Sequence, residues 1–265
     1  MWDASGMASF RLDKWYFDCV AADGAILIGY AARLKWGPIG LCYGARITMG
    51  ADGPLLQRHA LSLGQVGEEA SGVTWTNDSL GVAGQWTGGQ RFEPKVLFDA
   101  SAGSIEWQCL GADCDVSARV DGHSMRGRGY TERLSMTVPP WSLPFRELRW
   151  GRYIGEDGRD YAVWIDLREG LRRNWICVNS STPVEGTVDD AGVRAHGSEL
   201  VFEASRSIRN ENVARTLLGR LQFLSRVLPR GVRSIQENKQ LSSCVLSVDG
   251  SKSKGFAINE VVQWL

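Results

Sequence analysis

The sequence contains few of the residues from which metal centres and nucleophilic triads are built. It has three histidines in 265 residues, and each stands alone in a polar, loop-like stretch. Its six cysteines form no Cys-x-x-Cys pair, and motifs for nucleotide binding or for hydrolase nucleophiles are missing. We therefore expect no transition-metal site, no cofactor and no Ser-His-Asp catalysis, and we expect most cysteines to be buried thiols.

Long apolar runs and net charge are also missing. No stretch of about 18 apolar residues occurs, so no helix is expected to span a membrane. Thirty Lys and Arg residues balance thirty Asp and Glu residues, so nucleic acid is not an expected partner. Residues 1–15 do not combine a basic start with an apolar stretch, which is the pattern of a secretory signal. A cytoplasmic protein is expected, and nothing indicates its oligomeric state.

Tryptophan and glycine are abundant instead, with 11 and 31 residues. Short apolar segments alternate with Gly, Asn, Asp and Ser, and they predict strands, for example at 25–34, 41–49, 148–153 and 161–167. This spacing is typical of an antiparallel sandwich or barrel. Strands do not alternate with long helices, which disfavours a doubly wound α/β fold. We predict an all-β protein.

The two halves of the sequence resemble each other. Trp15 and Trp150 each begin a strand-like segment that is followed by an Asp-Gly pair, at offsets of 135 residues for the tryptophans and 134 for the pairs. Later in each half, residues 127–132 match residues 255–260 at an offset of 128. The pattern predicts a duplicated β module, and the seam between two modules is a natural place for a ligand.

A proline-rich segment separates the two halves. Three of the eight prolines fall within Val138–Pro144. Proline cannot donate to a β ladder and favours extended geometry in the residue before it. We therefore predict a crossover here, with one module over residues 1–140 and a second over residues 141–265.

One segment departs from the β pattern. Between residues 212 and 228, apolar residues recur at helical spacing with Arg215, Gln222 and Arg226 between them, ahead of Pro229. This predicts an amphipathic helix in the second module that packs on a sheet or plugs the end of a barrel. The alternative is a basic interfacial helix that makes a peripheral contact with a membrane.

The segment Lys14–Asp18 resembles the opening strand of the two-domain lipocalin-like (calycin-like) family that includes carotenoid 1,2-hydratase (hydroxyneurosporene synthase). A more distant resemblance extends to tocopherol cyclases and fungal Diels–Alderases. Gly129–Glu132 stands where a Gly-Tyr motif ends the first domain of that family, and Arg149–Tyr153 stands where a Trp-Gly strand opens the second. The chain differs from the family pattern at Lys14, which replaces an acidic residue, and at 131–133, which replace a His-rich cluster. The resemblance implies two lipocalin-like antiparallel β-barrel or sandwich modules and hydratase, isomerase or cyclase activity.

Glu132 is the first catalytic candidate, together with Tyr130. In a strand these two side chains point to the same face, and a carboxyl group in an apolar cavity keeps a proton available near neutral pH. The alternative is a structural salt bridge between Glu132 and a neighbouring arginine.

Asp18 is a second acid or an orienting group, or else a turn cap or surface ion pair. Asp166 and Glu260 are weaker counterparts in the second module.

Most tryptophans are expected to fill the core. Indole faces also attract cations, by about 0.5–2 kcal/mol each, which suits a reaction that passes through a carbocation. The predicted substrate-binding residues are Trp15, Trp141, Trp150, Tyr153 and Trp164.

Together these features favour a cofactor-independent hydro-lyase, isomerase or cyclase. Its partner would be a small hydrophobic molecule of isoprenoid or polyketide type, and Glu132 would protonate or orient it with help from Tyr130. One alternative is a noncatalytic protein that carries a lipophilic ligand. Another is a carbohydrate-active or carbohydrate-binding β-sandwich whose tryptophans stack on sugars, which, if hydrolytic, needs two carboxylates about 5–10 Å apart.

Overall fold

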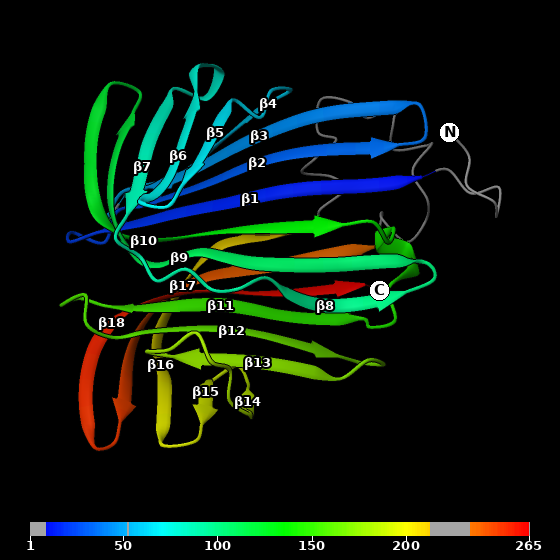
Figure 1. The fold of residues 1–265 in the computed structure, drawn as a ribbon. Coiled ribbons are helices and arrows are strands. Elements are labelled where there is room, and N and C mark those ends of the chain that lie inside the picture. The colour runs from blue at the N-terminus through cyan, green and yellow to red at the C-terminus, as the bar shows by residue number, and fades with distance from the viewer. Residues whose placement is uncertain (1–8, 52, 213–233, 265) are drawn as a thin grey trace. The chain divides into compact units, whose positions relative to one another are not determined.

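The computed structural model describes residues 9–51, 53–212 and 234–264. The chain divides into two compact units, Met1–Pro139 and Pro140–Leu265, and strands dominate both of them (Figure 1). The prediction of an all-β protein is therefore confirmed. All but the first residue of the helix predicted at 212–228 lies outside the described residues.

The first unit is an antiparallel sheet that curls into a nearly closed barrel. Within the described residues, its sheet has ten strands in the order β4-β3-β2-β1-β10-β9-β7-β6-β5, with β8 paired to β9. The 3₁₀ turn η1 (Asp78–Leu80) joins β6 to β7. The strands are β1 (Phe10–Ala21), β2 (Ile26–Trp36), β3 (Ile39–Met49), β4 (Leu55–Ala60), β5 (Gln65–Glu69), β6 (Gly72–Asn77), β7 (Val82–Thr87), β8 (Lys95–Ala100), β9 (Gly103–Val120) and β10 (His123–Met136).

Side chains of β6 donate hydrogen bonds to the segment that connects the edge strands β4 and β5. The Trp75 indole N–H donates to the backbone oxygen of Leu63 at 2.9 Å, and the Asn77 amide donates to that of Ser62, also at 2.9 Å. Trp75 and Asn77 are buried, whereas Thr74 and Thr76 between them are exposed. This alternation is that of a strand with one face on the core.

Aromatic rings fill the inside of the first unit. Trp75 and Trp86 are fully buried, and Phe17 stacks on Trp75 with ring centroids 5.1 Å apart. The strand β2 passes beneath Trp75 at Gly29, where an added Cβ would lie 2.3 Å from an indole carbon. A glycine therefore allows close packing of this tryptophan against the wall.

The second unit is a second antiparallel sheet. Within the described residues it has eight strands in the order β13-β12-β11-β18-β17-β16-β15-β14, and the turn η2 (Pro140–Ser142) precedes it. The strands are β11 (Glu147–Gly155), β12 (Tyr161–Arg168), β13 (Arg173–Val178), β14 (Gly186–Val188), β15 (Gly192–Ala195), β16 (Ser198–Asn212), β17 (Ile235–Val248) and β18 (Ser251–Trp264).

The two ends of this second sheet meet. An isolated bridge pairs Ile176 of β13 with Val184, and the Asn174 amide donates to the backbone oxygen of Gly186 in β14 at 2.7 Å. Trp164 lies in the apolar core inside this sheet. An added Cβ at Gly151 would lie 2.2 Å from its indole, so a glycine again makes room for a tryptophan.

The strand pairing that accompanies the sequence repeat differs by one residue between the two units, since Trp15 lies opposite Arg133 whereas Trp150 lies opposite Glu260. Glu132 lies opposite Tyr16, and Glu260 lies opposite Trp150. The Asp-Gly pair of each half forms the turn between the first two strands of its unit. In those turns Gly24 and Gly158 have φ values of 80° and 65°, a left-handed conformation that glycine adopts without strain.

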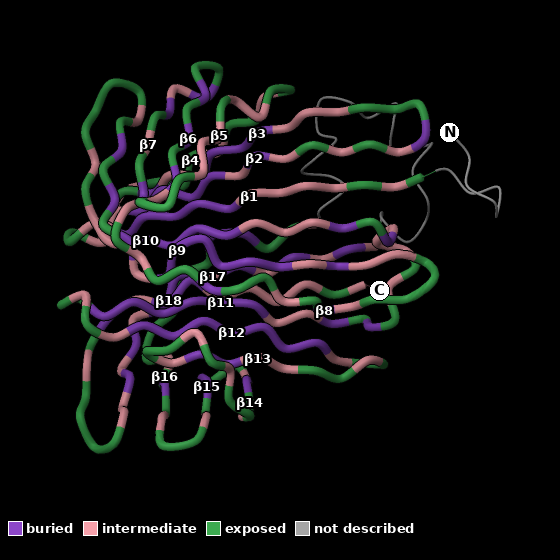
Figure 2. Tube along the Cα trace, in the orientation of Figure 1, coloured by how far each residue is buried: buried purple, intermediate pink, exposed green. Residues whose placement is uncertain are grey.

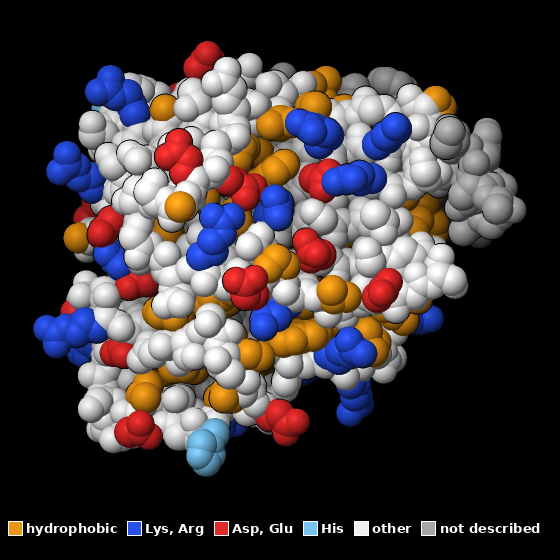
Figure 3. Space-filling model, in the orientation of Figure 1, with side chains coloured by type: hydrophobic (Ala, Val, Ile, Leu, Met, Phe, Trp, Pro, Cys, Tyr) orange, Lys and Arg blue, Asp and Glu red, His pale blue; other side chains and the backbone are white. Residues whose placement is uncertain are grey.

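Buried residues lie along the central strands of each unit, and charged residues of both signs lie on the surface. Purple, buried stretches run along β1, β2, β9 and β10 of the first unit and along β11 and β12 of the second (Figure 2). The face drawn in Figure 3 carries acidic and basic side chains interspersed. No helix among the described residues is long and apolar enough to cross a membrane.

The contact between Gly29 and Trp75 generates a first prediction. The substitution Gly29→Ala should lower the free energy of unfolding of the first unit by about 1–3 kcal/mol, because the new methyl group overlaps a fully buried indole. Urea denaturation followed by tryptophan fluorescence measures this change. The matched control is Gly40→Ala, since an added Cβ at Gly40 meets no atom within 4 Å. Equal midpoints for the two variants would contradict the packing described.

Candidate functional site

The wall made by β1, β10 and β9 has two faces. Phe17 and Cys19 belong to the apolar core cluster on one face, and strand alternation places Tyr16 and Asp18 on the other. The ladder sets Tyr16 opposite Glu132 and Asp18 opposite Tyr130. Three of the predicted catalytic residues, Glu132, Tyr130 and Asp18, thus share the face that lies away from the core, and we call it the acidic face.

Glu132 is buried and held by two neutral donors. The Trp107 indole N–H donates to its Oε2 at 2.5 Å, and the Tyr130 hydroxyl donates to the same oxygen at 2.9 Å. Trp107 reaches it because Glu132 lies opposite Cys109 in the ladder, so Trp107 is the diagonal neighbour from β9. These contacts orient a carboxylate that is only 5 % exposed.

Tyr130 and Cys109 stay protonated beside this carboxylate. Burial, together with the charge of Glu132, raises the pKa of Tyr130 well above its usual value. Burial also raises the pKa of the Cys109 thiol well above the ordinary range, with smaller contributions from Cys114 and Glu132. The Tyr130 hydroxyl is therefore a donor to Glu132 across the physiological pH range.

Asp18 ties the strand bearing Tyr130 to the core. Its carboxylate accepts the backbone N–H of Tyr130 at 3.1 Å, at a place where the register between β10 and β9 shifts around Thr131. Its backbone oxygen accepts the indole N–H of Trp86 at 2.6 Å. This geometry suits the orienting role more than that of a second acid.

The arginines that flank Glu132 in sequence bind other carboxylates. Arg128 pairs with Asp113 and Asp115, and Arg133 pairs with Glu68 at 3.4 Å. Arg149 of the second unit binds Glu147 at 2.7 Å and Asp190 at 2.6 Å.

The predicted substrate-binding residues do not gather in one place. Trp15 lies on the core side of β1, where its indole donates to Glu68 at 2.7 Å. Tyr153 and Trp164 are part of the core of the second unit. Trp141 lies in η2 and is partly buried, and Trp150 is buried.

A charged cluster surrounds Trp150 in the second unit. Lys239, which is fully buried, forms an ion pair with Glu260 and lies 5.0 Å from the centroid of the Trp150 ring. Arg209 and Glu237 form a second buried pair at 3.0 Å. Burial, followed by the charge of Glu260, raises the pKa of Glu237. Glu260, the counterpart of Glu132 in the sequence repeat, thus has an ammonium group opposite it.

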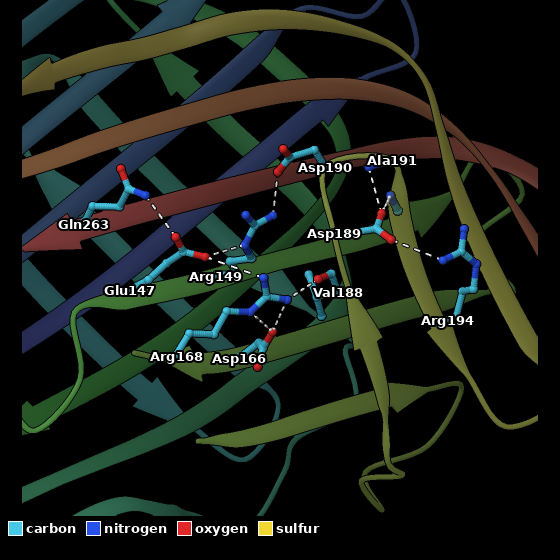
Figure 4. Close-up of polar contacts among 11 residues, drawn as sticks. Glu147, Arg149, Asp166, Arg168, Val188, Asp189, Asp190, Ala191, Arg194 and Gln263 are labelled. Carbon is cyan, nitrogen blue, oxygen red and sulfur yellow. Dashed lines mark hydrogen bonds and ion pairs between the residues drawn. The ribbon is translucent and has the colours of Figure 1, made fainter. Parts of the chain in front are cut away.

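A second polar network lies inside the second unit, toward the end of its sheet that holds the start of β11 (Figure 4). Glu147 accepts hydrogen bonds from Arg149 and Gln263, and Asp166 pairs with Arg168 at 2.6 Å. Although burial alone would raise it, the pKa of Glu147 is lowered by these donors and by the charges of Arg149 and Arg168. Asp166, a weaker candidate from the sequence, is therefore locked into an ion pair.

Sequence reasoning missed the partners of Glu132. Trp107 was expected only as a core residue, and Cys109 only as a buried thiol. Trp107 and Cys109 are two residues apart in one strand, so their side chains lie on the same face. Only the pairing of β9 with β10 shows that Glu132 lies on this face as well. Lys239 was missed too, because a lysine within a strand carries no signal of burial.

Among the described residues, no group of three or more His, Cys, Asp or Glu side chains is arranged to hold a metal ion.

Solved structures of similar fold span the whole chain. CghA matches with a TM-score of 0.55 and 12 % identity over 96 % of this chain and 88 % of its own. Kievitone hydratase from Nectria haematococca matches with a TM-score of 0.54 and 9 % identity over 97 % and 89 %. A putative AttH protein from Nitrosomonas europaea matches with a TM-score of 0.50 and 9 % identity over 97 % and 93 %. No family model and no curated protein matches the sequence.

These likenesses show the fold. The chain has the two-module, lipocalin-like architecture that the sequence resemblance implied, which confirms that expectation. At 9–12 % identity they carry no residue-by-residue correspondence to the site.

The burial of the cysteines predicts which thiol reacts. All six cysteines are free, and all but Cys42 are buried. In the native protein at about pH 8, iodoacetamide should modify Cys42 and leave Cys109 and Cys114 intact, because only an accessible thiolate reacts and burial raises the pKa of Cys114 to about 12.

Peptide mass spectrometry locates the modified residue, and Cys42→Ser is the control that should abolish the reaction. Rapid modification of Cys109 would contradict the burial and the raised pKa of this thiol.

Proposed function

We propose that the protein is a cofactor-independent hydro-lyase, isomerase or cyclase that acts on a hydrophobic substrate of isoprenoid or polyketide type. Glu132 is the group that exchanges a proton with the substrate. The observation that carries this proposal is a buried carboxylate whose Oε2 is held by two neutral donors, Tyr130 and Trp107.

The two groups that donate to Oε2 of Glu132 are both neutral. Hydrogen bonds from a hydroxyl and an indole orient Glu132, but unlike an arginine they bring no opposite charge that would fix it as an anion. Tyr130 keeps its own proton, so it is a positioning group that stabilises the ionised form after a proton has left Glu132.

Aromatic rings around Glu132 suit a cationic intermediate. Tyr16 lies opposite Glu132, with its ring centroid 5.4 Å from that of Tyr30 and 6.2 Å from that of Tyr130. Aromatic faces stabilise a nearby cation by about 0.5–2 kcal/mol each. Protonation of an alkene by Glu132 would give a carbocation. Addition of water to it, or loss of a different proton from it, would give the hydrated or isomerised product. Attack on it by a second alkene, followed by loss of a proton from the new cation, would give the cyclised product. In each case the released proton returns to the carboxylate of Glu132.

The fold likeness supports the hydro-lyase class within this proposal. Kievitone hydratase is named for the addition of water to a substrate. A fold shared with it adds to the argument from Glu132 but does not replace it, because unrelated chemistries recur on one fold.

A carboxylate variant tests the proposal. Native mass spectrometry and lipid extraction of the protein, purified from its own organism, supply the ligand on which activity is measured. Glu132→Gln keeps the size and hydrogen bonding of the side chain but cannot exchange a proton, so kcat/KM should fall about 10²–10⁴-fold while the Kd of the ligand stays within a few-fold.

The matched control is Glu93→Gln, an exposed carboxylate, which should leave kcat/KM unchanged. Tyr130→Phe should lower kcat more than it raises KM, because it removes a donor that acts on Glu132. Full activity of Glu132→Gln on an identified substrate would refute the assignment, and ligand retention without turnover in the unaltered protein would point to a carrier instead.

A further inference from the structure

A lysine on the acidic face has no carboxylate partner among the described residues. Lys14 lies in β1 two residues before Tyr16, so the two side chains point to the same face. It is partly buried, and its Nζ lies 5.9 Å from the centroid of the Tyr30 ring in β2. The charge of Lys14 thus lies over an aromatic face rather than beside an anion.

The groups around this ammonium are uncharged. Along β1 and across the ladder, the neighbours of Lys14 are Leu12, Tyr16, Leu134 and Ala32. A charge that is partly removed from water among such groups costs free energy, and the face of a tyrosine compensates only part of that cost. An anion bound to the ammonium would compensate more, because a hydrogen bond to a charged group is about twice as strong as one between neutral groups.

The carboxylates of the acidic face are held by other donors. Trp107 and Tyr130 donate to Glu132, and the backbone N–H of Tyr130 donates to Asp18. Glu132 belongs to β10 and Tyr30 to β2, and β1 lies between these two strands (Figure 1). The ammonium of Lys14 and the carboxylate of Glu132 therefore lie on opposite sides of β1, where they can contact different parts of one molecule.

The strand spacing gives the distance between those two parts. Neighbouring strands lie about 4.8 Å apart, so side chains above β2 and β10 are separated by about 10 Å. Beyond Lys14 the same face is apolar, since Leu12 lies opposite Met136 and Leu34. This arrangement fits a molecule that is hydrophobic apart from one anionic group.

A carboxylate matches the single positive charge of Lys14. It carries one negative charge, whereas a phosphate monoester carries about 1.5–2 and would need a further cation. Pairing with an anion also offsets a positive charge that would otherwise repel the carbocation proposed beside Glu132. An unsaturated carboxylic acid therefore suits both residues.

We propose that Lys14 binds the carboxylate of an unsaturated, hydrophobic acid whose chain extends across the acidic face to Glu132. Lys14 is the residue that determines specificity, because it selects acids over neutral esters of the same chain. It thereby sets the substrate class of the proposed function, on which this assignment rests, and no bond is broken at Lys14 itself.

Fluorescence titration of the whole protein with matched acids and esters tests the proposal. The probes are farnesoate and linoleate, and each is compared with its methyl ester, which has the same chain without the charge. At pH 7.5 the Kd of at least one acid should be tenfold or more below that of its ester. In Lys14→Met, which keeps the apolar stem of the side chain, this difference should disappear, and in Lys14→Arg most of it should return.

The matched control is Lys35→Met, which should leave every Kd unchanged. Lys35 is exposed, and alternation along β2 points it to the face opposite that of Ala32. Glu132→Gln should keep the preference for the acid, so an error in the catalytic assignment and an error in this one give different results. Failure of both acids to bind, equal Kd values for acid and ester, an equal loss of both in Lys14→Met, or tighter binding of farnesyl phosphate than of farnesoate would overturn the proposal.

Discussion

The antiparallel register between β1 and β10 is the constraint on which the first unit depends. It sets Glu132 beside Tyr16 and turns both away from Phe17 and the tryptophan core. A slip of one residue would exchange the two faces of the strand, and would place a carboxylate among indole rings. The large apolar surface of Trp75 and Trp86 opposes such a slip, so the core that stabilises the unit also determines which groups stand together on the acidic face.

Asp18 connects the core of the first unit to the acidic face. Asp18 uses its backbone oxygen to accept the Trp86 indole and its carboxylate to accept the Tyr130 amide. The position of Tyr130, and through its hydroxyl that of Glu132, is thereby fixed relative to the densest part of the unit. If Glu132 exchanges a proton as we propose, this preorganisation means that it needs little rearrangement when charge develops.

Sequence patterns predicted the features that are determined by residues close together in the chain. The strands, the turns at Gly24 and Gly158, and the shared face of Tyr130 and Glu132 follow from alternation and from turn chemistry. Trp107 could not be paired with Glu132, because that contact depends on the register between β9 and β10, which shifts around Thr131. The sequence also could not show that Trp164 belongs to the apolar core while Trp150 lies beside charged residues. Strand alternation separates the two faces of a sheet but does not say which of them is the core.

The repeated carboxylate has a consequence for the history of the two modules. Where Cys109 faces Glu132 in the first unit, Lys239 faces Glu260 in the second. One ladder position therefore decides whether the repeated carboxylate has a neutral thiol or an ammonium ion opposite it. A duplicated gene segment that kept both carboxylates could diverge by a single replacement at that position, with one copy beside a thiol and the other in an ion pair with a lysine.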